Sequence, residues 1–287
     1  MPTTKPAAQK ISATANLPDL SGEYPLAPEQ IKHFRSEGFV ILRGVLTPEE
    51  VEAYRAEIKR ATFELNKEKR KLEERDAYGK AFLQTLNLRL HSEGVRKLVT
   101  SRRLGKIAAD LMGVDGVRVY HEQSLFKEPG KGTNPTPWHQ DQYYWPLEEL
   151  TTLGFWMALV DVEQGMGGMK WAAGTHKLGF LGQHAISDES QKYYEAYIQE
   201  HHIRVTEGVP MKQGDVSFHY GWTLHAAGPN CSNKLREAMI GTYFADGMRV
   251  MKPSNASQEG DRVKFLGGKQ PGELADSPLN TLVYKKC

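Results

Sequence analysis

The stretch Trp138-His139-Gln140-Asp141 decides how the rest of this sequence is interpreted. On an extended chain alternate side chains point to the same face, so His139 and Asp141 would project together while Gln140 points away. Two metal ligands would then lie side by side. A histidine from a distant strand would complete a set of two histidines and one carboxylate, which binds Fe(II) and leaves further coordination positions open.

A later stretch offers two candidates for that histidine. Gly214-Asp215 favours a turn, and the β-prone run 216–220 that follows contains His219, five residues before Leu224-His225. Arg236 favours His225, because a strand that turns back after His225 could bring this guanidinium close to the site. A guanidinium binds a carboxylate through two hydrogen bonds, as an iron oxygenase with a dicarboxylate cosubstrate requires.

The amino-acid composition limits the kinds of molecule that the protein is expected to bind. The 287 residues include 37 basic and 35 acidic side chains, for a formal net charge of +2, and 39% of them are hydrophobic. This balance provides no electrostatic footprint for nucleic acid or an anionic membrane, so we expect a small-molecule substrate. Cys231 and Cys287 are too few for a disulfide framework and suit a reducing cytoplasm. The longest apolar run, residues 153–160, is too short to span a bilayer, so we expect a cytoplasmic location.

The pattern along the chain predicts one β-rich domain over residues 26–287, preceded by a flexible arm over residues 1–25. A helical scaffold is expected mainly within 28–112, with Thr47 capping one long helix and another covering 95–112. A β-rich core is expected mainly within 117–247, interrupted by an inserted helix at about 188–201 and followed by a tail over 248–287. The β-prone segments are 117–127, 154–162, 167–172, 203–207, 214–220 and 237–245.

The sequence resembles the phytanoyl-CoA dioxygenase-like Fe(II)/2-oxoglutarate oxygenases over roughly Leu26 to Gly247. The stretches that carry this resemblance are LAPEQIKHFRSEGFVILRGVLTPEEV, FKEPGKGTNPTPWHQDQYYWP, GFWMALVDV, GGMKWAAGTHKLG and GDVSFHYGWTLHAAGPNCSNKLREAM. The expected fold is therefore α+β and β-rich: a double-stranded β-helix, or jelly roll, flanked by N-terminal helices. The expected cofactors are Fe(II), the cosubstrate 2-oxoglutarate and O₂.

The resemblance also assigns individual residues. It makes His139, Asp141 and His225 the iron ligands and Arg236 the partner of the 2-oxoglutarate C5 carboxylate. It gives cosubstrate contacts to Gln123 and Trp156, and it leaves His219 in the core or at the wall of the pocket. Some relatives carry a hydroxyl residue two positions after the distal histidine, where this chain has Ala227, which cannot donate a hydrogen bond. Thr223, Tyr243 or water is expected to take that role.

Aromatic residues around the first ligand stretch are expected to line a substrate pocket, whereas His176 is expected to be structural. Strand alternation puts Tyr143 on the face of His139 and Asp141 and turns Tyr144 away, so Tyr143 is the first choice. The remaining candidates for the pocket are Trp138, Trp145 and Trp222.

The activity that the resemblance implies is hydroxylation, or another oxidation at a C–H bond, coupled to conversion of 2-oxoglutarate into succinate and CO₂. Asp141 fills the position that halogenases leave vacant for halide, which argues against halogenation. Two alternatives from other classes are a non-redox, cupin-type isomerase or lyase and a non-catalytic binding protein. The sequence does not specify the substrate, which could belong to lipid or natural-product metabolism. It also leaves monomer and homodimer open.

Overall fold

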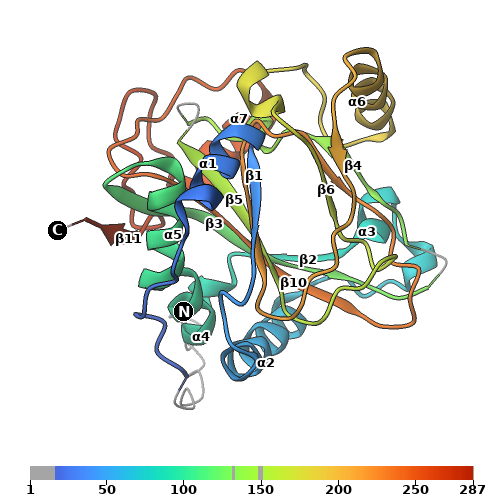
Figure 1. The fold of residues 1–287 in the computed structure, drawn as a ribbon, viewed down its shortest axis with the longest axis horizontal. Coiled ribbons are helices and arrows are strands. Elements are labelled where there is room, and N and C mark those ends of the chain that lie inside the picture. Colours follow the sequence, from blue (N-terminus) through green and yellow to red (C-terminus); the bar gives the residue numbers. More distant parts are fainter. Residues whose placement is uncertain (1–16, 131–132, 148–150, 287) are drawn as a thin grey trace, which may run out of the picture.

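The computed structural model describes residues 17–130, 133–147 and 151–286 (Figure 1). Two antiparallel sheets form the core of this part of the chain, as expected for a jelly roll. The strands of the large sheet lie in the order β1 (Phe39–Leu42), β8 (Val216–Tyr220), β5 (Thr152–Ala158), β10 (Arg236–Ala245), β3 (Gly116–Lys127) and β11 (Leu282–Lys285), with β2 (Leu83–Leu86) also paired to β3. Those of the small sheet lie in the order β4 (Thr136–His139), β9 (His225–Ala227), β6 (Met169–Ala172) and β7 (Val205–Thr206).

Helices from the first part of the chain cover the outer face of the large sheet, and Figure 1 shows α1, α4 and α5 on the side away from β4 and β6. They are α1 (Pro28–Glu37), α2 (Pro48–Leu65), α4 (Glu93–Val99) and α5 (Arg102–Met112). Thr47 caps α2 as expected, because its hydroxyl accepts from the backbone N–H of Glu50. Their apolar faces pack with the outward residues of the sheet in one hydrophobic core.

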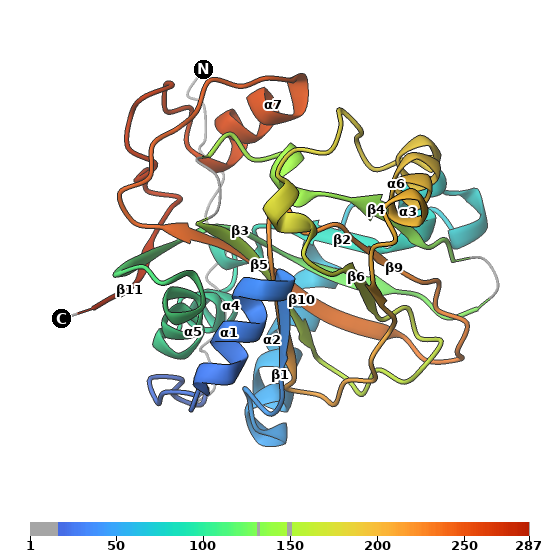
Figure 2. The ribbon, with the colours of Figure 1, turned by 45° about the horizontal axis from the view of Figure 1, so that its top comes forward.

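The remaining helices lie between strands in the order of the chain. They are α3 (Ala77–Ala81), α6 (Asp188–Glu200) and α7 (Ala256–Phe265), with short 3₁₀ turns η1 (Leu72–Glu74), η2 (Leu88–Leu90), η3 (Asp141–Tyr143) and η4 (Thr175–Leu178). Figure 2 shows α7 at the top, on the side of the sheets away from α2. The inserted helix expected at about 188–201 corresponds to α6.

Two expectations about local structure were wrong. The single helix over 95–112 is two helices, because Thr100 ends α4 and the Ser101 hydroxyl accepts from the Leu104 N–H to begin α5. The segment expected as a tail, 248–287, contains α7 and β11, and α7 packs into a cluster with Tyr120 and Trp145.

The described part of the expected N-terminal arm packs against the domain. Residues 17–25 form neither helix nor strand. Leu20 is nevertheless buried in the helical core, and the Tyr54 hydroxyl donates to the Pro18 carbonyl over 2.6 Å. Residues 1–16 of that arm lie outside the described residues.

Candidate metal and cosubstrate site

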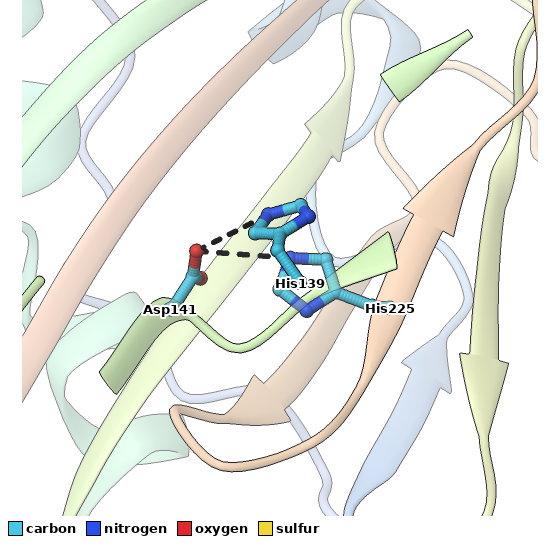
Figure 3. Close-up of side chains that lie close together, drawn as sticks. All are labelled: His139, Asp141 and His225. Atoms are coloured by element: carbon cyan, nitrogen blue, oxygen red, sulfur yellow. Dashed lines mark ion pairs between the residues drawn. The ribbon is translucent and has the colours of Figure 1, made fainter. Parts of the chain in front are cut away.

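The small sheet brings two of the expected ligands together. His139 ends β4 and pairs in register with His225, the first residue of β9. Their rings lie 4.1 Å apart between centroids. Figure 3 shows the two imidazoles next to each other with the Asp141 carboxylate facing both. Residues 86 positions apart in the sequence therefore meet because the two short strands that carry them are neighbours.

Asp141 reaches the same point through a bend in the chain. Gln140 is still extended, with φ −114° and ψ 123°, and its amide turns away to donate to the carbonyls of Gly179 and Trp222. Asp141 then opens the 3₁₀ turn η3 instead of continuing a strand. The alternation expected from the sequence holds for His139, Gln140 and Asp141 and ends there.

Three ligand atoms converge, one from each residue. The Nε2 atoms of His139 and His225 lie 3.5 and 3.7 Å from Oδ1 of Asp141. Among the described residues, this is the group of histidine, cysteine and acidic side chains whose ligand atoms all lie within 4.8 Å of one another. Ligands about 2.1 Å from a divalent transition ion lie ~3 Å apart at right angles, so a small contraction would close this set around one ion.

Backbone contacts prepare the imidazoles for metal binding. Nδ1 of His139 lies 2.7 Å from the Pro137 carbonyl, and Nδ1 of His225 lies 2.9 Å from the Thr223 carbonyl. A carbonyl accepts a hydrogen bond, so each Nδ1 carries the proton and each Nε2 keeps its lone pair. Burial, with His139 and His219 close by, lowers the pKa of His225 well below its usual value, which keeps the ring neutral as a ligand must be.

The carboxylate has the opposite requirement, because only its ionised form binds a cation. Burial by itself raises the pKa of Asp141, but the surrounding His225, His139 and His219 outweigh burial and hold this pKa well below the usual value. The donor set of two imidazoles and one carboxylate fits a divalent iron ion.

The structure gives His219 a contact with the ligand set. Its Nε2 lies 3.1 Å from Oδ2 of Asp141, the oxygen that does not face the two other ligands. His219 pairs across the sheet with Gly154, where an added Cβ would lie 3.1 Å from the imidazole and 3.5 Å from Oδ2 of Asp141. Glycine at 154 therefore leaves room for His219 to donate to Asp141 and to hold its orientation.

The contact between His219 and Asp141 is expected to affect metal affinity. Groups that hydrogen-bond to metal ligands typically change affinity or activity by about 10- to 100-fold when removed. We expect His219→Leu to weaken Mn(II) binding by about that factor in calorimetric titration, and His219→Gln, which keeps an N–H donor, to recover part of the loss. Equal affinity in His219→Leu and the wild type would rule out this positioning role.

Arg236 lies at the start of β10 and is 2% exposed. Its guanidinium carbon lies 5.2 Å from the ring centroid of Trp156, and its terminal nitrogens make only long hydrogen bonds of 3.3 Å to the Gly167 and Leu125 carbonyls. Its Nε is buried without a partner, and no ion pair among the described residues includes it. Burial lowers its pKa to about 10, so the group stays cationic at neutral pH. A buried cation without a carboxylate partner favours the binding of an anion beside it.

One neighbour of Arg236, Lys127, is a polar group that the sequence did not indicate. Lys127 pairs with Arg236 across the sheet, is fully buried and donates to the Asn134 and Gly228 carbonyls over 2.9 Å. Burial, followed by the proximity of Arg236, lowers the pKa of Lys127 to about 6. Gln123, which the sequence indicated as a cosubstrate contact, lines a cavity together with Arg236 and accepts a hydrogen bond from Gln84.

The two hydroxyls expected to compensate for Ala227 are engaged elsewhere. Thr223 donates to the Gly38 carbonyl, and Tyr243 donates to the Val99 carbonyl under the N-terminal helices. Thr136 is paired directly with Ala227 across β4 and β9, and both residues line the cavity that contains Arg236. The structure therefore offers Thr136 as the hydroxyl residue at this end.

A cavity of about 410 Å³ connects the candidate metal ligands with Arg236, and only some of the expected aromatic residues line it. Tyr144 and Trp145 line it, and so does His219. Tyr143 lines a neighbouring pocket with Trp222, because η3 breaks the strand alternation on which the choice of Tyr143 rested. Trp138 is buried in an apolar cluster with α6 and does not line the cavity. The preference for Tyr143 over Tyr144 as a wall of this cavity was wrong.

One expected non-ligand histidine lies apart from the metal site. The His176 ring stacks on Tyr220 with centroids 5.1 Å apart, and its Nε2 lies 3.1 Å from the Arg35 carbonyl. These contacts are structural.

Comparison with known proteins identifies the family. The sequence profile described as phytanoyl-CoA dioxygenase (PhyH) matches residues 34–238, most of the chain. The chain belongs to the phytanoyl-CoA dioxygenase family. This membership confirms the resemblance found in the sequence and, at the level of the family, the expectation of an enzyme that uses Fe(II), 2-oxoglutarate and O₂.

Individual relatives of this phytanoyl-CoA dioxygenase family member are distant. An ectoine dioxygenase of Streptomyces coelicolor is 28% identical over 58% of the chain and 55% of its own length. A probable alpha-ketoglutarate-dependent hypophosphite dioxygenase of Stutzerimonas stutzeri is 27% identical over 59% of each protein. The matched part thus spans a little over half the length of these curated relatives.

A solved structure covers more of the chain. The non-heme alpha ketoglutarate dependent carbocyclase SnoK from nogalamycin biosynthesis is 27% identical, covers 91% of this chain and 99% of its own, and superposes with a TM-score of 0.74. Its likeness confirms the α+β jelly-roll fold. Within the part of this chain that the structure describes, no helix is long and apolar enough to cross a membrane.

Proposed function

We propose that the chain is an Fe(II)- and 2-oxoglutarate-dependent dioxygenase that hydroxylates a C–H bond of a small organic molecule. One observation carries this proposal: the His139, Asp141 and His225 donors share a single cavity with Arg236, a buried cation that has no acidic partner among the described residues. A metal enzyme with a neutral substrate and no cosubstrate has no use for that cation. The non-redox alternative accounts for Arg236 only if its substrate is an anion.

Each residue has a distinct task in the proposed reaction. His139, Asp141 and His225 would hold the metal, and Arg236 would orient 2-oxoglutarate by binding its distal carboxylate through parallel hydrogen bonds. Bound iron, with 2-oxoglutarate and O₂, supplies the oxidation of the C–H bond while 2-oxoglutarate becomes succinate and CO₂. The buried walls of the cavity would keep bulk water from the reacting groups.

The finer outcome depends on how the substrate is positioned. The relatives are named as dioxygenases of ectoine and hypophosphite, and the solved relative as a carbocyclase, so similar scaffolds are associated with different substrates and outcomes. Hydroxylation is the proposed outcome because it needs no additional group beside the reacting carbon.

A spectroscopic titration and a turnover assay test this function together. The protein should bind Fe(II) without O₂, and adding 2-oxoglutarate should produce a visible metal-to-ligand charge-transfer band. A substrate library should then reveal compounds that stimulate succinate release, with a product heavier by one oxygen in mass spectrometry. The absence of a band at saturating 2-oxoglutarate would reject this function and favour a non-redox metal enzyme. A band without succinate release for any compound would favour a binding protein.

A further inference from the structure

The cavity extends past the ligand set, in the direction away from Arg236. Its walls follow one face of the large sheet, where the cavity-facing residues of β10 are Arg236, Ile240 and Thr242. Six residues of strand from Arg236 to Thr242 cover about 20 Å. The Arg236 guanidinium lies over the ring of Trp156, and Trp156 pairs with Ile240. The proposed 2-oxoglutarate site therefore occupies the part of the cavity between Arg236 and Ile240.

The row of residues at Thr242 locates the rest of the cavity. Across the strands this row reads His219, Gly154, Thr242 and His121. Asp141 lies against Gly154, as the 3.5 Å distance from its Oδ2 to a Cβ built there indicates. His121 is two strands further along the row, about 10 Å from Gly154 between Cα atoms. The space between them is where a substrate could present a C–H bond to the metal while its other end reaches His121.

Polar groups converge at that other end. His121 is 8% exposed, lines the cavity, and has a buried Nδ1 without a hydrogen-bond partner. Its ring lies 4.6 Å from that of Phe265, the last residue of α7. Asp261 and Lys264, one turn apart on α7, also line the cavity. Burial lowers the pKa of His121 to about 3, so its imidazole is neutral.

Asp261 is a partly buried carboxyl that accepts a hydrogen bond. Its Oδ2 accepts from the Tyr120 hydroxyl over 3.3 Å, and burial raises its pKa to about 7. Lys264 lies with its ammonium 4.9 Å from the Phe265 ring centroid, at the exposed side of the cavity. The Asn255 side chain, which caps α7, also donates to the Tyr143 carbonyl, so α7 is tied to the turn that carries Asp141.

We infer that His121 and Asp261 bind a hydroxyl group of a neutral substrate with a ring-shaped, apolar body. A hydroxyl both donates and accepts, so it can donate to the Asp261 carboxylate and accept from the imidazole of His121. This inference rests on the proposed function for the reaction, although the binding site itself does not require metal.

Charge and shape select this class among small molecules. A carboxylate on the substrate would face Asp261, Asp141 and the 2-oxoglutarate dianion, whereas an ammonium would face Lys264 and the metal. A neutral molecule avoids both repulsions. The remaining walls at this end are apolar and aromatic, and they suit a flat ring system: Leu86, Tyr144, Trp145, Ile186 and Phe265.

Four naphthalene probes of similar size test this class. They are 2-naphthol, 2-methoxynaphthalene, 2-naphthoate and 2-naphthylmethylammonium, each titrated calorimetrically into the whole protein with and without Mn(II) and 2-oxoglutarate. We expect 2-naphthol to bind most tightly and its methyl ether about tenfold more weakly, because that factor corresponds to the loss of one hydrogen bond of about 1.4 kcal/mol. Equal affinity for the four probes, or a preference for either ion, would overturn the inference.

Variants locate the binding site. Asp261→Asn and His121→Phe, which preserve side-chain size, should each remove most of the tenfold preference for 2-naphthol. Glu259→Gln makes the same carboxyl-to-amide change on α7, at an exposed residue that pairs with Arg262, and should keep the preference. Unchanged selectivity in both cavity variants would overturn the assignment.

The outcomes separate this inference from the proposed function. Selective binding of 2-naphthol by a protein that shows no 2-oxoglutarate band would reject the function and leave the hydroxyl site standing. Succinate release with other compounds, without discrimination among the four probes, would reject the hydroxyl site alone.

Discussion

Replacing Asp141 or His225 with Ala is expected to abolish both metal binding and succinate formation. Each change removes one of three converging donors, and two remaining protein ligands do not hold the ion in an open site of this kind. A metal centre contributes several kcal/mol to the barrier reduction, so loss of about 4 kcal/mol corresponds to a rate at least ~1000-fold lower. Calorimetric titration with Mn(II) and a succinate assay with Fe(II) measure the two effects.

Matched controls separate ligation from a general loss of structure. His201→Ala removes an exposed imidazole at the end of α6, and Asp161→Ala removes an exposed carboxylate that pairs with Lys212. Both controls should keep wild-type metal affinity. Retention of metal binding and turnover in either Asp141→Ala or His225→Ala would reject the ligand assignment.

The candidate ligands could be predicted from the sequence for two reasons. Two of them are close together in the chain, and the third is identified by its distance along the chain from Arg236. His139 and Asp141 are two residues apart, so any extended backbone turns both to one face. The choice of His225 over His219 needed the spacing to Arg236 and the family resemblance. The structure adds that both histidines approach Asp141, one through each carboxylate oxygen.

The spacing of apolar residues gave wrong predictions where a helix or strand ends because of local hydrogen bonds. The 3₁₀ turn at Asp141 exchanges the positions of Tyr143 and Tyr144, since one bent residue reverses the alternation on which the preference for Tyr143 rested. The break at Ser101 has a similar origin, because apolar spacing continues across a cap that divides one helix into two.

The residues at the end of the cavity away from Arg236 could not be predicted from the sequence. His121 lies in a β-prone run without any motif, and Asp261 and Lys264 lie in a charged stretch that resembles a solvated surface. They meet only because α7 folds back against β3 and the turn at Tyr143. Such an arrangement depends on tertiary packing, which no local pattern encodes.

Replacing Arg236 with Met is expected to weaken 2-oxoglutarate binding and, at the same time, to stabilise the free protein. Two charge-assisted hydrogen bonds to a carboxylate contribute about 1.5–3 kcal/mol each, so the apparent KM for 2-oxoglutarate should rise about 100- to 10,000-fold. The buried guanidinium lacks an acidic partner among the described residues, so its removal relieves an uncompensated charge. Met keeps an apolar side chain against Trp156.

Thermal unfolding with and without 2-oxoglutarate, alongside steady-state kinetics, measures these opposite effects. Wild-type protein with bound metal should gain Tm on addition of 2-oxoglutarate, since ligand at 100 times its Kd stabilises by about 2.7 kcal/mol. Arg236→Met should start from a higher Tm and gain little, while Arg204→Met, at an exposed arginine paired with Glu37, should behave like the wild type. A lower Tm with an unchanged KM would instead make Arg236 a structural residue. The expected result would mean that its buried charge is retained for the cosubstrate at a cost to the free protein.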